Sequence, residues 1–381
     1  MRARLSALLL IALAACSDRD PGALTAPASA TARVAATPTP VGAVFVETND
    51  ASANEVVAFD RASDGTLQLA GRYATGGQGT GGTVDPLQSQ YALVLSPNRK
   101  FLFAVNTASN SISSFQVDKG ALALVATVAA GGEHPVSLAA TNHVLYSLNS
   151  VSGTVTGFRI ASDGRLAPVA GWSRSLSPGA SGAAAIRFSH DGHLLAVAER
   201  LSQTIDVFGV EEDGSLTATP VSSHSAGLVP FGFDWTTRGQ LVVSEAGTNS
   251  ASSYDVARDG TLRVISASAV TLQRAPCWLI VTNDGRFAYT ANAGTGNLTG
   301  FDVAADGALS LVTLSGITGD LGAGSTPLDL DLSRDSQFLY VLKAGTGTIG
   351  AFAVNGDGSL RSLPDTPALP PRSGQMGLAA Y

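Results

Sequence analysis

Two glutamates, one histidine and one arginine are the residues of this 381-residue chain best suited to hydrolytic chemistry. Glu199, Glu245 and His134 are candidate general bases, because a carboxylate or an imidazole can take a proton from an attacking water. Arg187 is the candidate donor of hydrogen bonds to a developing oxyanion. No Gly-x-Ser-x-Gly sequence occurs, so a serine nucleophile is not expected. Together these residue types favour hydrolysis of an ester bond by an activated water.

Seven polar residues occupy equivalent places, each at the end of a predicted strand. In chain order they are Glu47, Asn106, Asn149, Glu199, Glu245, Asn292 and Lys343. Amide and charged groups hydrogen-bond polar ligands, so the three asparagines and Lys343 are candidate binding residues. Arg274 and Lys343 are also alternative oxyanion donors. We call these seven residues the strand-end ring.

Charged residues interrupt the predicted innermost strands. They are Arg187, Asp234, Asp329 and Asp331, which alternate with apolar positions. A buried charge is costly unless it is paired or faces water, so the pattern has two interpretations. One is a solvated channel, in which Asp234 and Asp331 join the binding residues. The other is an ion-pair network that ties neighbouring elements together.

The sequence argues against metals, cofactors and nucleic acids as partners. His190 and His193 flank a predicted Asp-Gly turn and need no ligand, and neither a His-Glu-x-x-His sequence nor a calcium-binding loop occurs. The three tryptophans occupy unrelated places, so a quinone-dependent dehydrogenase is not indicated. A net charge of −7 and a pI near 5.2 leave no basic surface for phosphates. We therefore expect no metal, no cofactor and no nucleic acid.

A hairpin sequence that occurs seven times must position these residues. Its clearest copy, residues 205–216, has an aromatic residue, an apolar residue two positions later, then Asp-Gly and Leu. Alternating apolar residues followed by Asp-Gly are a strong hairpin signal. Successive aromatics lie 43 to 56 residues apart, the period of a four-stranded propeller blade. The aromatics are Phe59, Phe115, Phe158, Phe208, Tyr254, Phe301 and Phe352.

The rest of the repeat supplies two further strands per blade. Residues 279–298 read as a strand, an Asp-Gly turn, a second strand and a polar loop. The chain begins with an unpaired second strand at 42–46 and ends with an unpaired first strand at 376–381. We therefore predict an all-β, seven-bladed β-propeller of four-stranded antiparallel blades, closed by the C-terminal strand. The Asp-Gly turns share its lower face, and the glycine-rich connections between blades share its upper face, where binding residues are expected.

The first 40 residues have the composition of an export signal and a tether. Arg2 and Arg4 precede an apolar run that is too short to span a bilayer as a stable helix. Leu-Ala-Ala-Cys at 13–16 is typical of bacterial lipoproteins, in which the cysteine is lipidated. We expect a signal peptide at 1–15, a lipidated Cys16 opening a disordered tether at 16–40, and the propeller at 41–381. An exported, lipid-anchored protein of the cell envelope follows, periplasmic or surface-facing, with an ordinary secretory signal as the alternative.

The repeat resembles that of a known family. Residues 102–112 and 288–298, with the Phe-x-Val-x-x-Asp-Gly-x-Leu hairpin, resemble the Tyr-Val-Thr-Asn repeat of the seven-bladed lactonase propellers, which include 6-phosphogluconolactonases. The resemblance covers residues 41–381 and implies a site of His, Glu and Arg residues around the upper mouth of the channel. Arg187 and Glu199 lie in the segment similar to the family's Arg and Asn-Glu positions. Here Glu199 takes the Asn place and Arg200 takes the Glu place.

The sequence leaves two functions open. One is a lactonase-like enzyme that hydrolyses a small lactone or sugar-like substrate at the upper face. The other is a non-catalytic surface propeller that binds a glycan, a peptide or a protein partner. In either case we expect a monomer that meets the membrane only through its lipid anchor.

Overall fold

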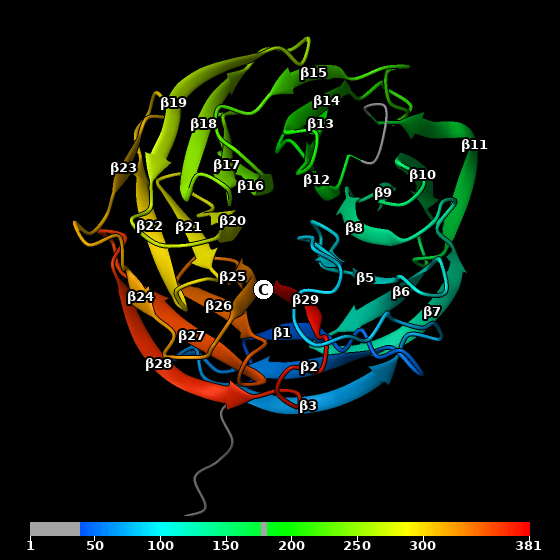
Figure 1. Ribbon diagram of the computed structural model, residues 1–381. Helices are drawn as coiled ribbons and strands as arrows, with labels where there is room; N and C mark the ends of the chain where they lie inside the picture. The colour runs from blue at the N-terminus through cyan, green and yellow to red at the C-terminus, as the bar shows by residue number, and fades with distance from the viewer. Residues whose placement is uncertain (1–38, 177–180) are drawn as a thin grey trace, which may run out of the picture. The chain divides into compact units, whose positions relative to one another are not determined.

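The predicted hairpins form the outer halves of seven antiparallel sheets, arranged as a ring of blades (Figure 1). The computed structural model describes residues 39–176 and 181–381, and these residues belong to one compact unit. The described residues contain 29 strands and no helix that could cross a membrane. This architecture confirms the predicted all-β, seven-bladed propeller. The predicted signal peptide, Cys16 and most of the tether lie outside the described residues.

We number the blades in chain order. Blade 1 contains β1 (Gly42–Glu47), β2 (Glu55–Arg61), β3 (Leu67–Ala74) and β29 (Met376–Ala380). Blade 2 contains β4 (Leu93–Leu95), β5 (Phe101–Asn106), β6 (Ser111–Asp118) and β7 (Ala121–Ala129). Blade 3 contains β8 (Pro135–Ala140), β9 (Val144–Asn149), β10 (Thr154–Ile160) and β11 (Leu166–Ser175). Blade 4 contains β12 (Ala183–Phe188), β13 (Leu194–Glu199), β14 (Thr204–Gly209) and β15 (Val221–His224).

In the remaining three blades, as in blades 2 to 4, the first four strands follow one another across the sheet in chain order, whereas in blade 1 β29 lies beside β1. Blade 5 contains β16 (Pro230–Trp235), β17 (Leu241–Glu245), β18 (Ser250–Val256) and β19 (Leu262–Val270). Blade 6 contains β20 (Pro276–Val281), β21 (Phe287–Asn292), β22 (Asn297–Val303), β23 (Leu309–Leu311) and the short β24 (Gly319–Asp320). Blade 7 contains β25 (Pro327–Leu332), β26 (Phe338–Lys343), β27 (Thr348–Val354) and β28 (Leu360–Pro367).

The C-terminal strand closes the ring. β29 pairs antiparallel with β1, with Val44 opposite Ala380 and Phe45 opposite Ala379. Two backbone hydrogen bonds between Ala43 and Tyr381 continue this ladder. Blade 1 therefore joins the two ends of the propeller, and its innermost strand is not left as an open edge.

The repeated aromatics pack inside the blades, and the Asp-Gly pairs turn the chain on the lower face. All seven aromatics are at most 2% exposed, and burying such a side chain stabilises the fold by roughly 1.5–3 kcal/mol. In the turn after β14, Gly214 has a φ of 88°, which a side chain would disfavour. Asp213 Oδ1 accepts a hydrogen bond from Ser215 N at 2.9 Å across the same turn. The Asp-Gly pairs therefore have a structural role.

A long connection enters the centre of the ring. The connection between β3 and β4 has 18 residues, 75–92, whereas the other connections between blades have five to eight. Within it, Leu87, Ser89, Gln90 and Tyr91 are at most 4% exposed. We call Leu87–Tyr91 the central segment. In Figure 1 the light-blue to cyan chain beside β5 runs inside the ring of inner strands.

The central segment satisfies its polar groups with the inner strands of several blades. Ser89 Oγ donates to Val136 O of blade 3 at 2.8 Å, and Gln90 N donates to Ala184 O of blade 4 at 2.9 Å. The Gln90 side-chain amide donates to Leu279 O of blade 6 at 2.7 Å and accepts from Leu279 N at 3.2 Å. These contacts reach opposite sides of the ring.

Tyr91 bonds the central segment to two further blades. Its hydroxyl donates to Phe233 O of blade 5 at 2.7 Å, and its N–H donates to Asp329 Oδ2 of blade 7 at 3.3 Å. The Arg187 guanidinium lies over its ring, 4.5 Å from the centroid. The central segment is thus bonded to five blades.

Candidate functional site

The strand-end ring lies where the sequence placed it, but its side chains are buried. Each of its seven residues is the last residue of the second strand of its blade. Six are 0% exposed, and Lys343 is 6% exposed. A buried ring of this kind holds the loops above it and does not form an open polar surface.

Hydrogen bonds of the binding candidates show what the ring holds. Asn292 Nδ2 donates to Asn297 Oδ1 at 2.8 Å and to Thr299 Oγ1 at 2.9 Å, within its own blade. Asn106 Oδ1 accepts from Thr75 Oγ1 of the preceding blade at 2.6 Å. Of the other two binding candidates of the ring, Asn149 Nδ2 donates to Thr156 Oγ1 at 3.3 Å, and Lys343 forms an ion pair with Asp365. These side chains fasten the start of the third strand and the neighbouring loops.

The two glutamate candidates serve loops of different blades. Glu245 accepts hydrogen bonds from Ser225 Oγ and Gly227 N, both at 2.8 Å, in the connection that leads into blade 5. Glu199 accepts from Ser202 Oγ at 2.7 Å in the loop after β13. Both carboxylates are fully buried. Each glutamate therefore bonds to a loop of its own, and the two carboxylates do not share one cavity.

His134 lies in the upper connection between blades 2 and 3. It has a φ of 61°, and its N–H donates to Asn110 Oδ1 at 2.8 Å. Its carbonyl accepts from Ser150 N at 2.9 Å. Partial burial lowers the pKa of its imidazole, which keeps the ring neutral. The residue thus has a clear role in holding this connection in place.

Arg187 is the one catalytic candidate at the channel axis, but it lies toward the lower end. Its Nε forms an ion pair with Asp234 Oδ1 of blade 5 at 2.7 Å. Arg187 is paired with Ala196, three residues before Glu199, which separates their backbones by roughly 10 Å along the strand. Burial lowers the pKa of Arg187, but the combined effect of the nearby Asp234, Tyr91, Asp331 and Asp329 raises it above its ordinary value. The guanidinium stays charged.

Two inner-strand aspartates each tie their own blade to the next one. Asp234 Oδ2 accepts from Val281 N of blade 6 at 3.1 Å, and Asp331 Oδ2 accepts from Ala380 N of blade 1 at 2.8 Å. Burial raises the pKa of Asp331 to about 6 and that of Asp329 to about 8. Of the two interpretations of these charges, the geometry favours the network between blades.

The upper mouth holds a different pair of charged groups. Asp85, on the long connection above the central segment, lies near Arg200, whose positive charge lowers the pKa of the carboxyl. Burial has the larger effect and raises the pKa of Asp85 to about 7. Asp85 Oδ1 and Arg200 Nε are buried and have no hydrogen-bond partner among the described residues. Two unpartnered polar atoms of opposite charge therefore lie at the same mouth.

Blades 4 to 6 provide the wall beside this pair. Arg200 N donates to Gly182 O at 3.1 Å, which fixes the backbone of the arginine. Its guanidinium lies 5.8 Å from the centroid of the Phe231 ring. Phe231 packs edge-on against Trp278 at 5.1 Å, and Trp278 Nε1 donates to Ser89 O of the central segment at 2.8 Å. The aromatic wall thus connects Arg200 to residues 75–92, the long connection that carries both the central segment and Asp85.

Cys277 also lies near this pair, but its chemistry is limited. Burial raises the pKa of its thiol to about 12, so the thiol stays protonated and weakly nucleophilic. Within residues 39–176 and 181–381, no group of three or more His, Cys, Asp or Glu side chains could hold a metal ion. An aspartate and an arginine therefore carry the chemistry available at the mouth.

Sequence reasoning identified Arg200 only by its place beside Glu199 and did not identify Asp85. Asp85 belongs to a connection that has no copy in the other blades, so the repeat gave no reference for its position. The unusual length of that connection was the available signal.

Comparisons with known proteins agree on the fold. A family model described as "Lactonase, 7-bladed beta-propeller" matches residues 51–171, 136–271 and 242–374. A periplasmic gluconolactonase of Pseudomonas aeruginosa aligns with a TM-score of 0.68 and 20% identity, over 89% of this chain and 99% of that chain. A Bacteroides fragilis protein provisionally named a 6-phosphogluconolactonase aligns with a TM-score of 0.71 and 18% identity, over 91% and 99%. At these identities the structures show the fold alone, and no curated protein matched.

Proposed function

Because the chain belongs to the lactonase family of seven-bladed β-propellers, we propose that it hydrolyses a sugar lactone at the upper mouth of its channel. Asp85 is the general base in this proposal, and Arg200 is the oxyanion donor. The observation that carries it is the buried, unpartnered pair of Asp85 Oδ1 and Arg200 Nε at the mouth. The names of the gluconolactonase and 6-phosphogluconolactonase neighbours support the substrate class.

The reaction follows from the two groups. Asp85 takes a proton from water, and the water oxygen attacks the lactone carbonyl carbon. The Arg200 guanidinium donates to the carbonyl oxygen as it becomes an oxyanion. When the tetrahedral intermediate collapses, the ring C–O bond breaks, and the leaving alkoxide takes the proton back from Asp85. The product is an open-chain hydroxy acid, and the carboxylate of Asp85 is regenerated.

The surroundings of Asp85 suit this role. A general base works best when its pKa is close to the working pH, and burial raises the pKa of Asp85 to about 7. The aromatic wall of Phe231 and Trp278 keeps Arg200 against an apolar surface, where its hydrogen bonds are stronger than in water.

We also propose that the protein is exported and lipid-anchored through Cys16. The support is the N-terminal sequence, together with the periplasmic location in the name of the Pseudomonas aeruginosa neighbour. An enzyme in that place would act on lactones outside the cytoplasm.

A second candidate function, a non-catalytic binding propeller, is favoured by one observation. Several apolar side chains of upper-face loops are exposed: Val151 by 65%, Leu201 by 64%, Leu272 by 58% and Leu228 by 48%. Exposed apolar residues gathered on one face mark many protein-binding surfaces. This function would need no chemistry from Asp85 and Arg200.

A lactone assay separates the two functions. Hydrolysis of D-glucono-1,5-lactone and a panel of other lactones is measured above the spontaneous rate, for wild type and for the Asp85→Asn and Arg200→Gln variants. We expect each substitution to lower kcat/KM by about 10²-fold or more. Asp163→Asn, an exposed hairpin aspartate paired with Arg165, is the matched control and should keep full activity.

The sequence-based candidate Glu199→Gln is measured in parallel. If no lactone is hydrolysed above background, the enzyme proposal fails in favour of binding. If Glu199→Gln abolishes activity in a folded protein while Asp85→Asn does not, the reaction takes place at the strand-end ring instead.

A further inference from the structure

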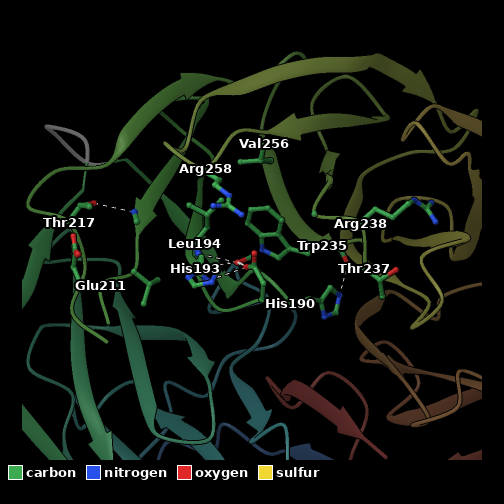
Figure 2. A pocket seen from close by; sticks show the side chains of 15 residues that line it. His190, His193, Leu194, Glu211, Thr217, Trp235, Thr237, Arg238, Val256 and Arg258 are labelled. Carbon is green, nitrogen blue, oxygen red and sulfur yellow. Dashed lines mark hydrogen bonds between the residues drawn. The ribbon is translucent and has the colours of Figure 1, made fainter. Parts of the chain in front are cut away.

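A separate pocket opens on the lower face, between blades 4 and 5, and neither Asp85 nor Arg200 lines it. Its volume is about 520 Å³, a size that holds a small molecule. It is lined by the lower turns of both blades, and Figure 2 shows the side chains around it. Its floor is apolar, with Leu194 and Trp235 almost fully buried.

The sequence explains why this interface is hollow. In blades 3, 6 and 7, the residue three positions before the strand-end residue of the blade is a tyrosine. Its side chain reaches the next blade. Tyr146, Tyr289 and Tyr340 donate their hydroxyls to the carbonyls of Gly214, Gly358 and Gly65 at 3.0, 2.9 and 2.9 Å. Blade 4 has Ala196 at this position, and alanine cannot make that contact.

The outer strand of blade 4 is also short, because it lacks the part nearest the lower face. β15 has four residues, whereas the outer strands of blades 1, 2, 3, 5 and 7 have eight to ten. Pro220 directly precedes β15, and its missing N–H prevents the strand from extending toward the lower face. Thr217 therefore lines the pocket at a place where other blades continue their outer strand.

At the rim of the pocket, the Arg258 guanidinium is available to pair with a ligand. Arg258 is exposed and forms no hydrogen bond or ion pair with the described part of the chain. Arg238 is committed elsewhere, because its Nη2 donates to Gly285 O at 3.0 Å and Ala304 O at 3.2 Å. In Figure 2 the Arg258 side chain reaches toward the hollow, whereas that of Arg238 extends away from it.

The other polar groups of the rim can bond hydroxyl groups. His190 Nε2 is within 3.0 Å of Trp235 O, which leaves its other ring nitrogen available. His193 and Glu211 are exposed and line the same opening. The carboxylate of Asp191 is already engaged, since its Oδ1 accepts from Ser189 Oγ at 2.6 Å and from His193 N at 3.1 Å.

We propose that this lower-face pocket binds a small hydroxylated carboxylic acid. The ligand carboxylate pairs with Arg258, whose planar guanidinium can bond both oxygens at once. The hydroxyl groups bond to His193 and Glu211, and the carbon chain lies over Leu194 and Trp235. This site does not depend on lactone hydrolysis at the upper mouth, although a lactone's product belongs to the same chemical class.

Titration calorimetry with three probes tests the proposal. Sodium D-gluconate carries both kinds of group, sodium hexanoate only the carboxylate, and sorbitol only the hydroxyls. We expect saturable binding of gluconate, and binding of the other two at least about 10-fold weaker. Arg258→Gln should weaken gluconate binding by about 10-fold or more. His193→Ala should reduce the ratio of the affinity for gluconate to the affinity for hexanoate.

Two further variants isolate the pocket. Arg263→Gln is the matched control, because Arg263 is an exposed arginine of the same blade that pairs with Asp255 outside the pocket. Arg200→Gln tests the upper mouth, and Arg258-dependent binding should persist in it whether or not hydrolysis is lost. The proposal is overturned if gluconate shows no saturable binding up to about 10 mM, or if Arg258→Gln binds as tightly as Arg263→Gln.

Discussion

Replacing Asp329 with asparagine should flatten the pH dependence of the propeller's stability. Asp329 is 1% exposed on β25, where Oδ1 accepts from Leu330 N at 3.0 Å and Oδ2 accepts from Tyr91 N at 3.3 Å. Burial raises the pKa of this carboxyl from its ordinary value of 3.8 to about 8 in the folded chain. The folded state therefore holds a proton that the unfolded state has already lost at neutral pH.

The sign of the effect follows from this difference. The stability that the proton contributes is fully present below the unfolded pKa and is lost as the pH rises through the folded pKa, near 8. Between pH 5 and pH 8 the free energy of unfolding should fall by about 4 kcal/mol on account of this one group, at 1.36 kcal/mol per pH unit. Asparagine stays neutral, so the free energy of unfolding of the variant should not show this fall.

Urea unfolding of wild type and variant at pH 5 and pH 9 measures the difference. The fall in free energy of unfolding between the two pH values should be smaller in Asp329→Asn by a few kcal/mol. Asp118→Asn, at an exposed strand end, is the control and should keep the wild-type dependence. Equal pH dependence in wild type and Asp329→Asn would refute the reasoning that this carboxyl is protonated in the folded chain.

Two further predictions concern the central segment and the membrane anchor. Gln90→Leu removes both bonds between the Gln90 amide and Leu279, so the free energy of unfolding should fall by about 2–4 kcal/mol, whereas the exposed Gln78→Leu should change it by less than about 0.5 kcal/mol in the same urea titration. An unaffected Gln90→Leu variant would mean that the central segment is not held by this residue. Cys16→Ser should move the protein from the membrane fraction to the soluble fraction on cell fractionation, and unchanged partitioning would rule out lipidation of Cys16.

The fold could be predicted because the same hairpin occurs seven times. The repeat fixed the number of blades, the strand that closes the ring and the residue that ends each second strand, from Glu47 to Lys343. Each of these features depends on residues that are close in sequence and repeated, so local rules are sufficient.

The burial of the strand-end ring could not be read from the same pattern. Glu245 is covered by Ser225 and Gly227, which arrive from the preceding connection, and Asn106 is covered by Thr75 of another blade. Covering of this kind depends on how the connections between blades fold. A polar residue at a predicted loop edge therefore looked like a binding residue although it fastens the loop.

The central segment and Asp85 were missed for a related reason. Their positions are set by long-range contacts, such as that of Gln90 with Leu279, which are 189 residues apart. The lower-face pocket is different, because Ala196 stands in the sequence where three other blades have a tyrosine. Comparing the copies of the repeat at each position can identify such a hollow before a structure exists.

The pH dependence of lactone hydrolysis tests the central claim most directly. Asp85 acts as a base only when its carboxyl is ionised, so kcat/KM should rise with pH through a midpoint near 7, the pKa to which burial raises this group. In Asp85→Asn the residual activity above the spontaneous rate should lose that midpoint. A profile with the same midpoint and height in Asp85→Asn would contradict the account, because some other group would then be the base.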